Sequence, residues 1–520
     1  MESLRSKITL SVEWQLILFF AITKLSIHLL TYDNYELHRD AYLYYAQSQH
    51  LAWGFVAVPP SIAFIGYIAT SIFGNTVFAL RFFPALIGAF STILIGMTVL
   101  ELGGKKKAVL LACAAYVISP AYLHVNTLFQ PVSFNHFYWI LSGYLILRMI
   151  HRKDPKMWIW IGLVFGLAFL NKYSIAFFIL AFGMALLISE HRKLLFNQYF
   201  VVGLGIGLLI ITPNLIWQYE QNWPVVSHMT QLRETQLIHV QASDFLLEQL
   251  LMNMQALLIW FTALLILLFN KKEKQYRIFG YLFIGVIVLL LAGSGKSYYT
   301  LGVYPILFAF GAYLIEKYTA TKKYSNYVTG FLILFMVPVL YISLDLSGIP
   351  FRTPEQMSRE AAFRWEDGRY YDIPQDMSDM RGWKEIGEEV KKLYLSLPGE
   401  ERNEVAILAN HYGQAGSVMF YGKQAGVPQP ITFNDSFVLW APDSLNTEYV
   451  IYIMGPWAED IEERLQERYE IVTLIKTIEN PWFRENGTRI FLCRYPNDSM
   501  KSLYTEGIRR LKDQYKRAGN

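Results

Sequence analysis

The segment PPSIAFIGYIATSIFG, residues 59–74, sets the topology of this 520-residue chain. It is apolar, but its 16 residues are fewer than the about 20 that a helix needs to cross a bilayer core. Its Pro59-Pro60 opening suits the start of a helix. If this helix crosses the membrane, every later loop faces the other side from where it would otherwise lie.

Basic residues distinguish the two alternatives. Residues 1–350 carry 24 Lys and Arg against 15 Asp and Glu. With a cytoplasmic N-terminus and residues 59–74 on the surface, 18 of those 24 basic residues face the cytoplasm, whereas at most six do if the segment crosses. The positive-inside rule therefore favours a helix lying at the outer surface of the membrane.

Eleven other apolar runs predict membrane-spanning helices, after which the chain becomes more charged. Residues 351–520 hold 22 basic and 27 acidic residues, and short apolar strands and amphipathic helices alternate there, with strands expected at 405–408, 449–453, 471–475 and 489–493. We therefore expect a polytopic α-helical membrane domain over residues 1–350 and a soluble α/β domain over residues 351–520, outside the membrane. The runs are 14–30, 78–100, 108–123, 132–150, 158–170, 174–189, 199–217, 245–269, 278–292, 301–315 and 328–346.

The first outer loop holds the main candidate for catalysis. From Asp40 to Trp53 apolar and aromatic residues recur at helical spacing, which places Asp40 near the N-terminus of a helix. A carboxylate there can be a helix cap. The alternative is a general base at the membrane boundary.

Other polar residues collect on the same outer side. Lys296, Tyr298 and Tyr299 follow one predicted span and can either anchor the chain at the interface or bind a lipid phosphate by charge-assisted hydrogen bonds. Ionisable groups at the ends of spans are costly unless they are solvated or paired, so their convergence suggests a site. The further candidates are Arg39, His124, Lys172, Arg233 and Glu234.

Several short motifs, in order along nearly the whole chain, resemble glycosyltransferase family 39 and the related aminoarabinose (lipid A) transferases of the GT-C superfamily. In the first loop they are Arg39-Asp-Ala-Tyr-Leu-Tyr-Tyr45, His50-Leu-Ala-Trp-Gly54, Val58-Pro-Pro60 and Ala79-Leu-Arg81. Later ones are Leu128-Phe-Gln-Pro-Val132, Leu170-Asn-Lys-Tyr173, Pro213-Asn-Leu-Ile-Trp217, Leu232-Arg-Glu-Thr-Gln236, Gly295-Lys-Ser-Tyr-Tyr299 and Arg381-Gly-Trp383.

The resemblance implies a GT-C fold of about 11 transmembrane helices, with surface helices in the first outer loop. It also implies an inverting glycosyltransferase that moves a sugar from a polyprenyl phosphate donor to a hydroxyl- or phosphate-bearing acceptor on the periplasmic side. Asp40 matches the family's catalytic position, and we assign Lys296, Arg233 and Tyr299 to the donor phosphate. Arg39 is assigned either to that phosphate or to Asp40 itself. His124, Lys172, Tyr298 and Glu234 are secondary candidates.

No cofactor or nucleic acid partner is predicted. Many family members have Asp-Glu where this chain has Asp40-Ala41, which weakens the case for a second carboxylate that binds metal. A requirement for a divalent cation stays open, although the spacing of residues shows no ligand cluster for one. The expected location is the bacterial inner membrane, with a cytoplasmic N-terminus and a periplasmic C-terminal domain. The rival function is a transporter or flippase of lipid-linked sugars, and the sugar, acceptor and oligomeric state stay open.

Overall fold

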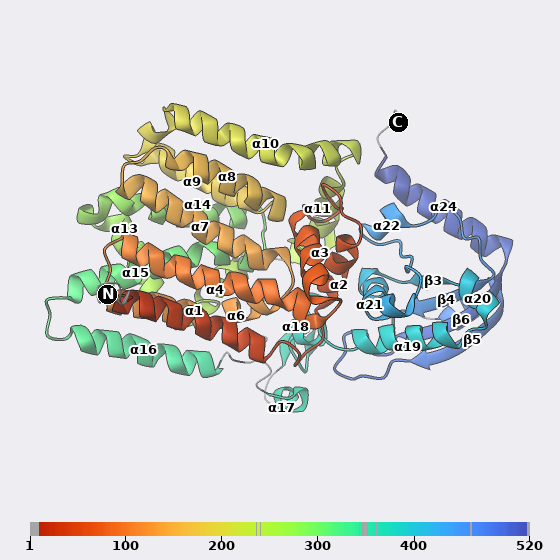
Figure 1. Cartoon of the computed structure of the whole chain (residues 1–520). Coiled ribbons are helices and arrows are strands. Elements are labelled where there is room, and N and C mark those ends of the chain that lie inside the picture. The colour runs from red at the N-terminus through yellow and green to blue at the C-terminus, as the bar shows by residue number, and fades with distance from the viewer. Residues whose placement is uncertain are drawn as a thin grey trace, which may run out of the picture.

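The protein is elongated, with a helical bundle at one end and a mixed α/β region at the other, in the computed structural model shown in Figure 1. The structure describes residues 10–235, 237–239, 241–342, 344, 349, 352–359, 362–457 and 460–516. The expected domain boundary near residue 350 falls largely among residues outside these ranges. Within them, the bundle ends with α16 (Ser325–Ile342), and the α/β region begins with the short helix α17 (Pro354–Ser358), which a small hairpin follows.

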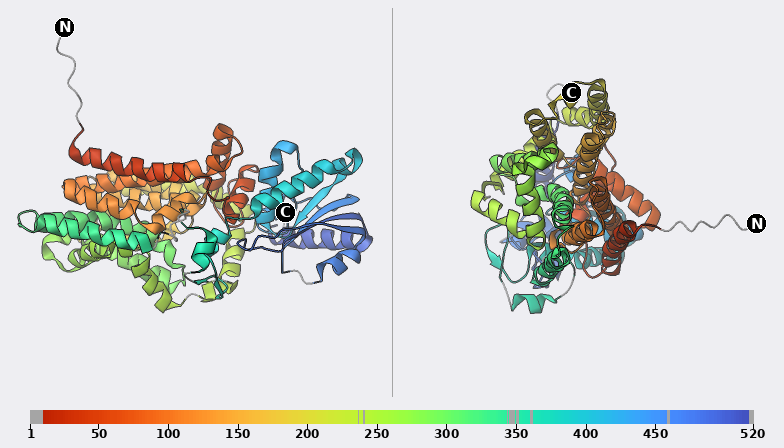
Figure 2. Two further views of the ribbon diagram at one scale, coloured as in Figure 1. Left: turned by 90° about the horizontal axis from the view of Figure 1, so that it is seen from below. Right: turned by 90° about the vertical axis from the view of Figure 1, so that its left-hand side faces the viewer.

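The bundle consists of long apolar helices that lie roughly side by side (Figures 1 and 2). They are α1 (Val12–Leu30), α4 (Val77–Glu101), α5 (Lys106–Val117), α6 (Pro120–Thr127), α7 (Pro131–His151), α8 (Met157–Asn171), α9 (Ile175–Ile188), α10 (Gln198–Glu220), α12 (Ala242–Leu251), α13 (Leu257–Phe269), α14 (Arg277–Ala292), α15 (Tyr304–Thr319) and α16 (Ser325–Ile342).

Each of the eleven predicted spans coincides with one of these helices or with a bent pair. Six helical segments among the described residues are long and apolar enough to cross a membrane, and the pairs α5–α6 and α12–α13, bent by 57° and 60°, raise this number to eight. Two further helices, α8 and α9, are apolar but shorter. The 21-residue α7 is more polar, with Asn135 and His136 buried inside the bundle. The protein is thus a multi-helix membrane protein, while the number of crossings stays a prediction.

Residues 59–74 form a short helix across one end of the bundle. This helix, α3 (Ser61–Phe73), follows α2 (Arg39–Ser48), and both lie at the end that faces the α/β region (Figure 1). With 13 residues, α3 is too short to cross a bilayer core. Its position matches the surface helix that the charge count predicts.

The basic loops meet at the opposite end of the bundle. Arg152 pairs with Glu101 at 2.5 Å, Lys317 with Glu273 at 2.6 Å, and the carboxylate of Glu316 accepts a hydrogen bond from the Lys105 N–H at 2.6 Å. The start of α1 lies at this end too (Figure 1). The protein therefore has a basic end and, opposite to it, an end that carries the α/β region.

The α/β region is built on a four-stranded sheet of order β3-β4-β6-β5. Strands β3 and β4 are parallel and the other pairs antiparallel, with Ala406 opposite Val450 and Val472 opposite Cys493. The strands are β3 (Ala406–Ala409), β4 (Tyr449–Met454), β5 (Tyr469–Thr477) and β6 (Arg489–Pro496), close to the predicted ranges, and a hairpin of β1 (Phe363–Arg364) and β2 (Tyr370–Tyr371) precedes them.

Helices surround this sheet and join it to the bundle (Figure 1). They are α17 (Pro354–Ser358), α18 (Gln375–Ser378), α19 (Trp383–Ser396), α20 (Gly399–Glu404), α21 (Tyr412–Gly422), α22 (Phe437–Trp440), α23 (Ile461–Gln466) and α24 (Asp498–Gln514). The remaining α11 (Pro224–Thr235) belongs to the loop after α10.

Helix α2 is buried between the bundle and the α/β region. Tyr42 and Tyr45 are fully buried and belong to one hydrophobic core with Leu80 of α4 and with Trp383 and Phe420 of the α/β region. At Gly416 of α21 an added Cβ would lie 2.6 Å from the Tyr42 carbonyl oxygen, so only glycine allows the two helices to pack this closely. The shared core fixes the α/β region against the first outer loop.

Two charged side chains anchor the first outer loop, one from α4 and one from the loop itself. Arg81 of α4 donates to the Tyr35 carbonyl at 3.1 Å and to the Glu36 carbonyl at 2.6 Å. The Glu36 carboxylate in turn accepts from the backbone N–H groups of Gly382 at 3.1 Å and Lys384 at 2.8 Å, at the start of α19. The loop that leads into Asp40 is therefore anchored to both parts of the protein before any ligand binds.

Candidate active site

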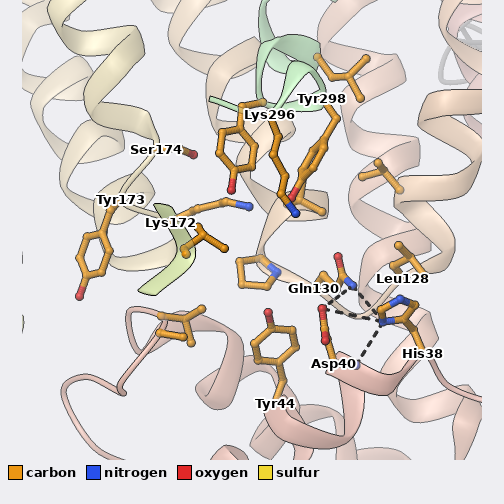
Figure 3. A pocket seen from close by; sticks show the side chains of 18 of the residues that line it. His38, Asp40, Tyr44, Leu128, Gln130, Lys172, Tyr173, Ser174, Lys296 and Tyr298 are labelled. Carbon is orange, nitrogen blue, oxygen red and sulfur yellow. Dashed lines mark hydrogen bonds and ion pairs between the residues drawn. The ribbon is translucent and has the colours of Figure 1, made fainter. Parts of the chain in front are cut away.

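A cavity of about 1160 Å³ lies where the bundle meets the α/β region. Its polar wall includes Asp40, Gln130, Lys172 and Lys296, which point toward one another from different elements (Figure 3). The rest of the wall is largely apolar, with side chains from α8, α9, α10, α11 and α16. The cavity thus combines a charged end with an extended apolar surface.

Asp40 sits in the first turn of α2. The ring of His38 caps this helix, because its Nδ1 accepts a hydrogen bond from the Asp40 backbone N–H at 3.2 Å. The Asp40 side chain does not cap the helix itself but extends toward the cavity (Figure 3). Of the two roles that the sequence left open for Asp40, the cap thus belongs to His38.

Three neighbours hold the Asp40 carboxylate. Tyr412 donates its hydroxyl to Oδ1 at 2.7 Å, Gln130 donates to Oδ2 at 3.3 Å, and Arg39 Nε lies 3.8 Å from Oδ1. Burial alone would raise the pKa of Asp40, but the nearby positive charges and the Tyr412 hydroxyl lower it below its usual value. Asp40 is therefore an ionised carboxylate at neutral pH.

Two lysines face Asp40 from the opposite wall. Lys296 Nζ pairs with Glu366 at 2.7 Å. Lys172 Nζ lies over the Tyr299 ring at 4.9 Å and the Tyr298 ring at 5.8 Å, and no described carboxylate is within ion-pairing distance of it. Burial, together with the charge of Lys296, lowers the pKa of Lys172 to about 8. This part of the cavity has a positive charge that the described part of the protein does not neutralise.

A group of His and Asp side chains lies next to Asp40. His124 Nε2 lies 2.8 Å from Asp376 Oδ2, while His38 Nε2 lies 3.7 Å from Asp376 Oδ1 and 3.9 Å from Asp379 Oδ2. The interactions with His124 and His38 lower the pKa of Asp376 well below its usual value, although burial acts in the other direction. Arg484 pairs with Asp379 at 2.9 Å.

His38, Asp376 and Asp379 are close enough together to ligate a metal ion, a grouping that the spacing of residues in the sequence did not indicate. However, His38 Nδ1 accepts from the Asp40 N–H and from Gln130 Nε2, the latter at 3.2 Å. A neutral imidazole has one N–H and one lone pair, so these bonds place its proton on Nε2, toward the two carboxylates. This tautomer fits a hydrogen-bond donor better than a metal ligand, and we assign no metal here.

The structure brings together seven of the nine residues that the sequence singled out. Arg39, Asp40, His124, Lys172, Lys296, Tyr298 and Tyr299 line the cavity. Arg233 and Glu234 do not: they are exposed on α11, whose Leu232 and Met229 face the cavity instead. A helix shows different faces at adjacent positions, so Leu232 of this motif contributes to the wall while Arg233 and Glu234 lie on the surface.

Sequence reasoning missed the contributions of the α/β region. Tyr412, Asp376, Asp379, Glu366 and Asp435 all line the cavity, although they follow the last helix of the bundle. The stretch His411-Tyr-Gly413 after β3 reads as an ordinary turn. The motif Arg381-Gly-Trp383 was the available signal, because it lies directly after Asp379.

Comparisons with known proteins agree with this fold. The profile of the family described as dolichyl-phosphate-mannose-protein mannosyltransferase matches residues 57–217. Lipid A galacturonosyltransferase RgtD from Rhizobium johnstonii is 22% identical over 214 residues, which are 41% of this chain and 45% of the relative. The match thus spans less than half the length of this curated relative.

Solved structures match over more of the chain. ArnT from Cupriavidus metallidurans bound to undecaprenyl phosphate superposes with a TM-score of 0.62 at 13% identity, covering 93% of this chain and 98% of ArnT. The same protein in its apo state gives a TM-score of 0.59 at 12% identity. Sequence and fold together support a GT-C membrane glycosyltransferase. The fold of this chain is similar to that of ArnT.

Proposed function

We propose that this protein transfers a sugar from a polyprenyl-phosphate-linked donor to an acceptor on the periplasmic side of the inner membrane, with inversion at the anomeric carbon. One observation carries the proposal. The Asp40 carboxylate faces Lys172, a lysine without an ion-pair partner among the described residues, across a cavity that is otherwise largely apolar.

The lysine side of the cavity suits a lipid phosphate. Lys172 and Lys296 repel each other, so an anion placed between them gains two charge-assisted contacts and relieves the repulsion. The hydroxyl groups of Tyr298 and Tyr299 are further donors for the phosphate oxygens. Undecaprenyl phosphate is bound in the ArnT structure of the same fold.

The apolar side suits the polyprenyl chain. Phe169, Leu215, Met229 and Val339 come from four helices, α8, α10, α11 and α16, and line one continuous surface with the charged groups. An isoprenoid chain buries its apolar area there, at roughly 25 cal/mol per Å² removed from water. Where the isoprenoid chain moves from lipid rather than from water, this gain is smaller. The charged end of the cavity therefore sets the position of the donor.

The chemistry follows from this arrangement. Asp40 accepts the proton of an acceptor hydroxyl while the acceptor oxygen attacks the anomeric carbon. The bond between that carbon and the phosphate oxygen breaks on the opposite side, and its electron pair stays on the phosphate, whose added charge Lys172 and Lys296 stabilise. An acceptor that is itself a phosphate is already deprotonated, so it needs no general base. A single displacement of this kind inverts the anomeric centre.

The proposal is tested with the purified full chain in lipid nanodiscs. We expect it to cleave one member of a panel of polyprenyl phosphate sugars slowly without an acceptor, releasing polyprenyl phosphate, because water then replaces the acceptor. Cleavage identifies the sugar. A protein that moves the intact donor across the bilayer of liposomes without breaking the glycosidic bond is a flippase, and that result contradicts the proposal.

A further inference from the structure

A second cavity, of about 440 Å³, adjoins the first in the α/β region. Of the described residues that line it, five are aromatic and three are charged, and Ile373 is the one with a branched aliphatic chain. Its volume falls within the usual range for small-molecule sites, about 300–1,000 Å³. Unlike the Asp40 cavity, its lining does not suit an aliphatic lipid chain.

The aromatic rings in this cavity are fixed before any ligand binds. Trp365 donates its indole N–H to the Ile373 carbonyl at 2.8 Å and stacks on Tyr371, with ring centroids 3.7 Å apart. Trp482 donates its indole N–H to Glu355 at 3.0 Å. Because both indole N–H groups have protein partners, the cavity is rigid and a ligand loses little side-chain entropy there.

Trp457 differs from the other tryptophans of this cavity because it is exposed. Its side chain is 61% accessible. One part of its ring lies against Gly455, where an added Cβ would approach within 2.5 Å. The absence of a side chain at Gly455 thus leaves room for the indole, which is largely exposed and lines the cavity. An exposed tryptophan in a fixed orientation is typical of a binding surface.

Polar groups complete the cavity. The Asp372 carboxylate is exposed and makes no hydrogen bond with a described residue, so it is available as an acceptor. Arg484 lines the cavity while it pairs with Asp379 at 2.9 Å, and its remaining N–H groups are donors. A flat aromatic face with nearby acceptors and donors matches a sugar ring, which has an apolar C–H face and hydroxyl groups at its edge.

The two cavities share a wall. Gln375 of α18 lines both. It donates to Glu366 at 3.1 Å, and Glu366 pairs with Lys296 at 2.7 Å in the first cavity. A ligand in the second cavity therefore lies beside the side chains that hold Lys296 of the donor site.

We propose that the second cavity binds a saccharide portion of the acceptor, with its ring stacked on Trp457 and its hydroxyl groups on Asp372 and Arg484. This inference rests on the proposed function, because only a transferase has an acceptor to position. It names the acceptor's chemical class as a glycan or glycolipid headgroup rather than an unglycosylated peptide.

Saturation-transfer NMR tests the site directly. The full chain is purified in a detergent without a sugar headgroup and mixed at millimolar concentration with methyl glycosides and with neutral, amino and acidic disaccharides. We expect at least one saccharide to bind, and its apparent affinity to fall at least tenfold in Trp457→Ala and in Asp372→Ala. Trp160→Ala is the matched control, because Trp160 is similarly exposed, at 54%, on α8.

The outcomes separate this inference from the proposed function. If no saccharide of the panel binds, or if binding survives both Trp457→Ala and Asp372→Ala, the saccharide site is wrong. Donor cleavage by the wild-type chain, measured without any saccharide, reports on the Asp40 cavity alone. Its absence counts against the proposed function even where a saccharide binds at Trp457.

Discussion

Asp40 combines two properties that usually oppose each other, burial and a lowered pKa. The carboxylate is 29% exposed, and the Tyr412 hydroxyl and Arg39 compensate for the solvent that it loses. It is a weak base that is ionised at neutral pH, which suits an acceptor that transfers its proton late in the reaction. Its chemistry therefore depends on neighbours from the bundle and from the α/β region.

Replacing Asp40 by Asn tests its role as the base. Asn keeps the shape and the hydrogen bond with Tyr412 but cannot accept a proton from the acceptor. For a hydroxyl acceptor we expect kcat to fall by roughly 10²–10⁴, with a donor KM within a few-fold of the wild-type value, measured as release of polyprenyl phosphate. Asp443→Asn is the control, because Asp443 is 87% exposed and remote from the cavity. A wild-type rate in Asp40→Asn refutes the base assignment.

Lys172 gives the donor site a pH dependence. Its pKa is lowered to about 8, so the ammonium is charged below that pH and neutral above it. We expect the donor KM to rise as the pH passes through about 8. In Lys172→Arg this rise disappears, since guanidinium keeps its charge. Lys156→Arg, at an exposed site, is the control and should keep the wild-type dependence of the donor KM on pH. If the donor KM of the wild type does not change between pH 7 and 9.5, Lys172 does not belong to the phosphate site.

At the scale of single elements, the contact between α2 and α21 lets the bundle and the α/β region both contribute residues to the site. Tyr412 begins α21, whose Gly416 packs against the Tyr42 carbonyl of α2. The contact brings the Tyr412 hydroxyl to Asp40, 372 positions earlier in the chain. The α/β region therefore shapes the electrostatics of a carboxylate that belongs to the first outer loop.

Removing the Tyr412 hydroxyl should move the acid limb of the pH profile. Asp40 acts while ionised, so activity falls as the pH drops through its pKa, which the hydroxyl lowers. A hydrogen bond to a charged group contributes about 1.5–3 kcal/mol, and 1.36 kcal/mol corresponds to one pKa unit. In Tyr412→Phe we expect the acid limb of kcat to shift upward by about one pH unit.

The matched control is Tyr421→Phe. Tyr421 lies on the same helix, and its hydroxyl pairs with that of Tyr42 at 3.2 Å rather than with Asp40. Its acid limb should coincide with that of the wild type. An equal shift in both variants means that loosening of α21, and not the hydrogen bond to Asp40, changes the profile.

At the scale of the whole molecule, the two ends differ in charge and in the elements that they carry. The basic loops and the start of α1 lie at one end, and the cavity and the α/β region at the other (Figure 1). The positive-inside rule places the basic end in the cytoplasm. The periplasmic position of the active site is the corresponding proposal.

Cysteine labelling checks this orientation, since both native cysteines, Cys113 and Cys493, are buried and give little background. We expect a membrane-impermeant maleimide to label Asp443→Cys in cells whose outer membrane alone is permeabilised. Lys323→Cys, exposed in the loop before α16, should react only after the inner membrane is opened. The reverse pattern contradicts the orientation.

The sequence was sufficient for local structure, and it gives a prediction for the direction of the chain across the membrane. Continuous apolar runs predicted the eleven segments, and the charge count predicted that residues 59–74 lie on the surface, because both signals depend on neighbours in sequence and on the surrounding solvent. Motifs adjacent to the spans also located Asp40, Lys172 and Lys296, which line one cavity.

Only the tertiary structure decided what surrounds Asp40. Tyr412, Asp376 and Asp379 reach the cavity because a buried core joins α2 to the α/β region, and no local pattern encodes which distant side chains such packing brings together. For the same reason Arg233 and Glu234, predicted for the site, lie on the exposed side of α11. Residue type and spacing determine which groups can act, whereas packing over hundreds of residues determines which of them meet.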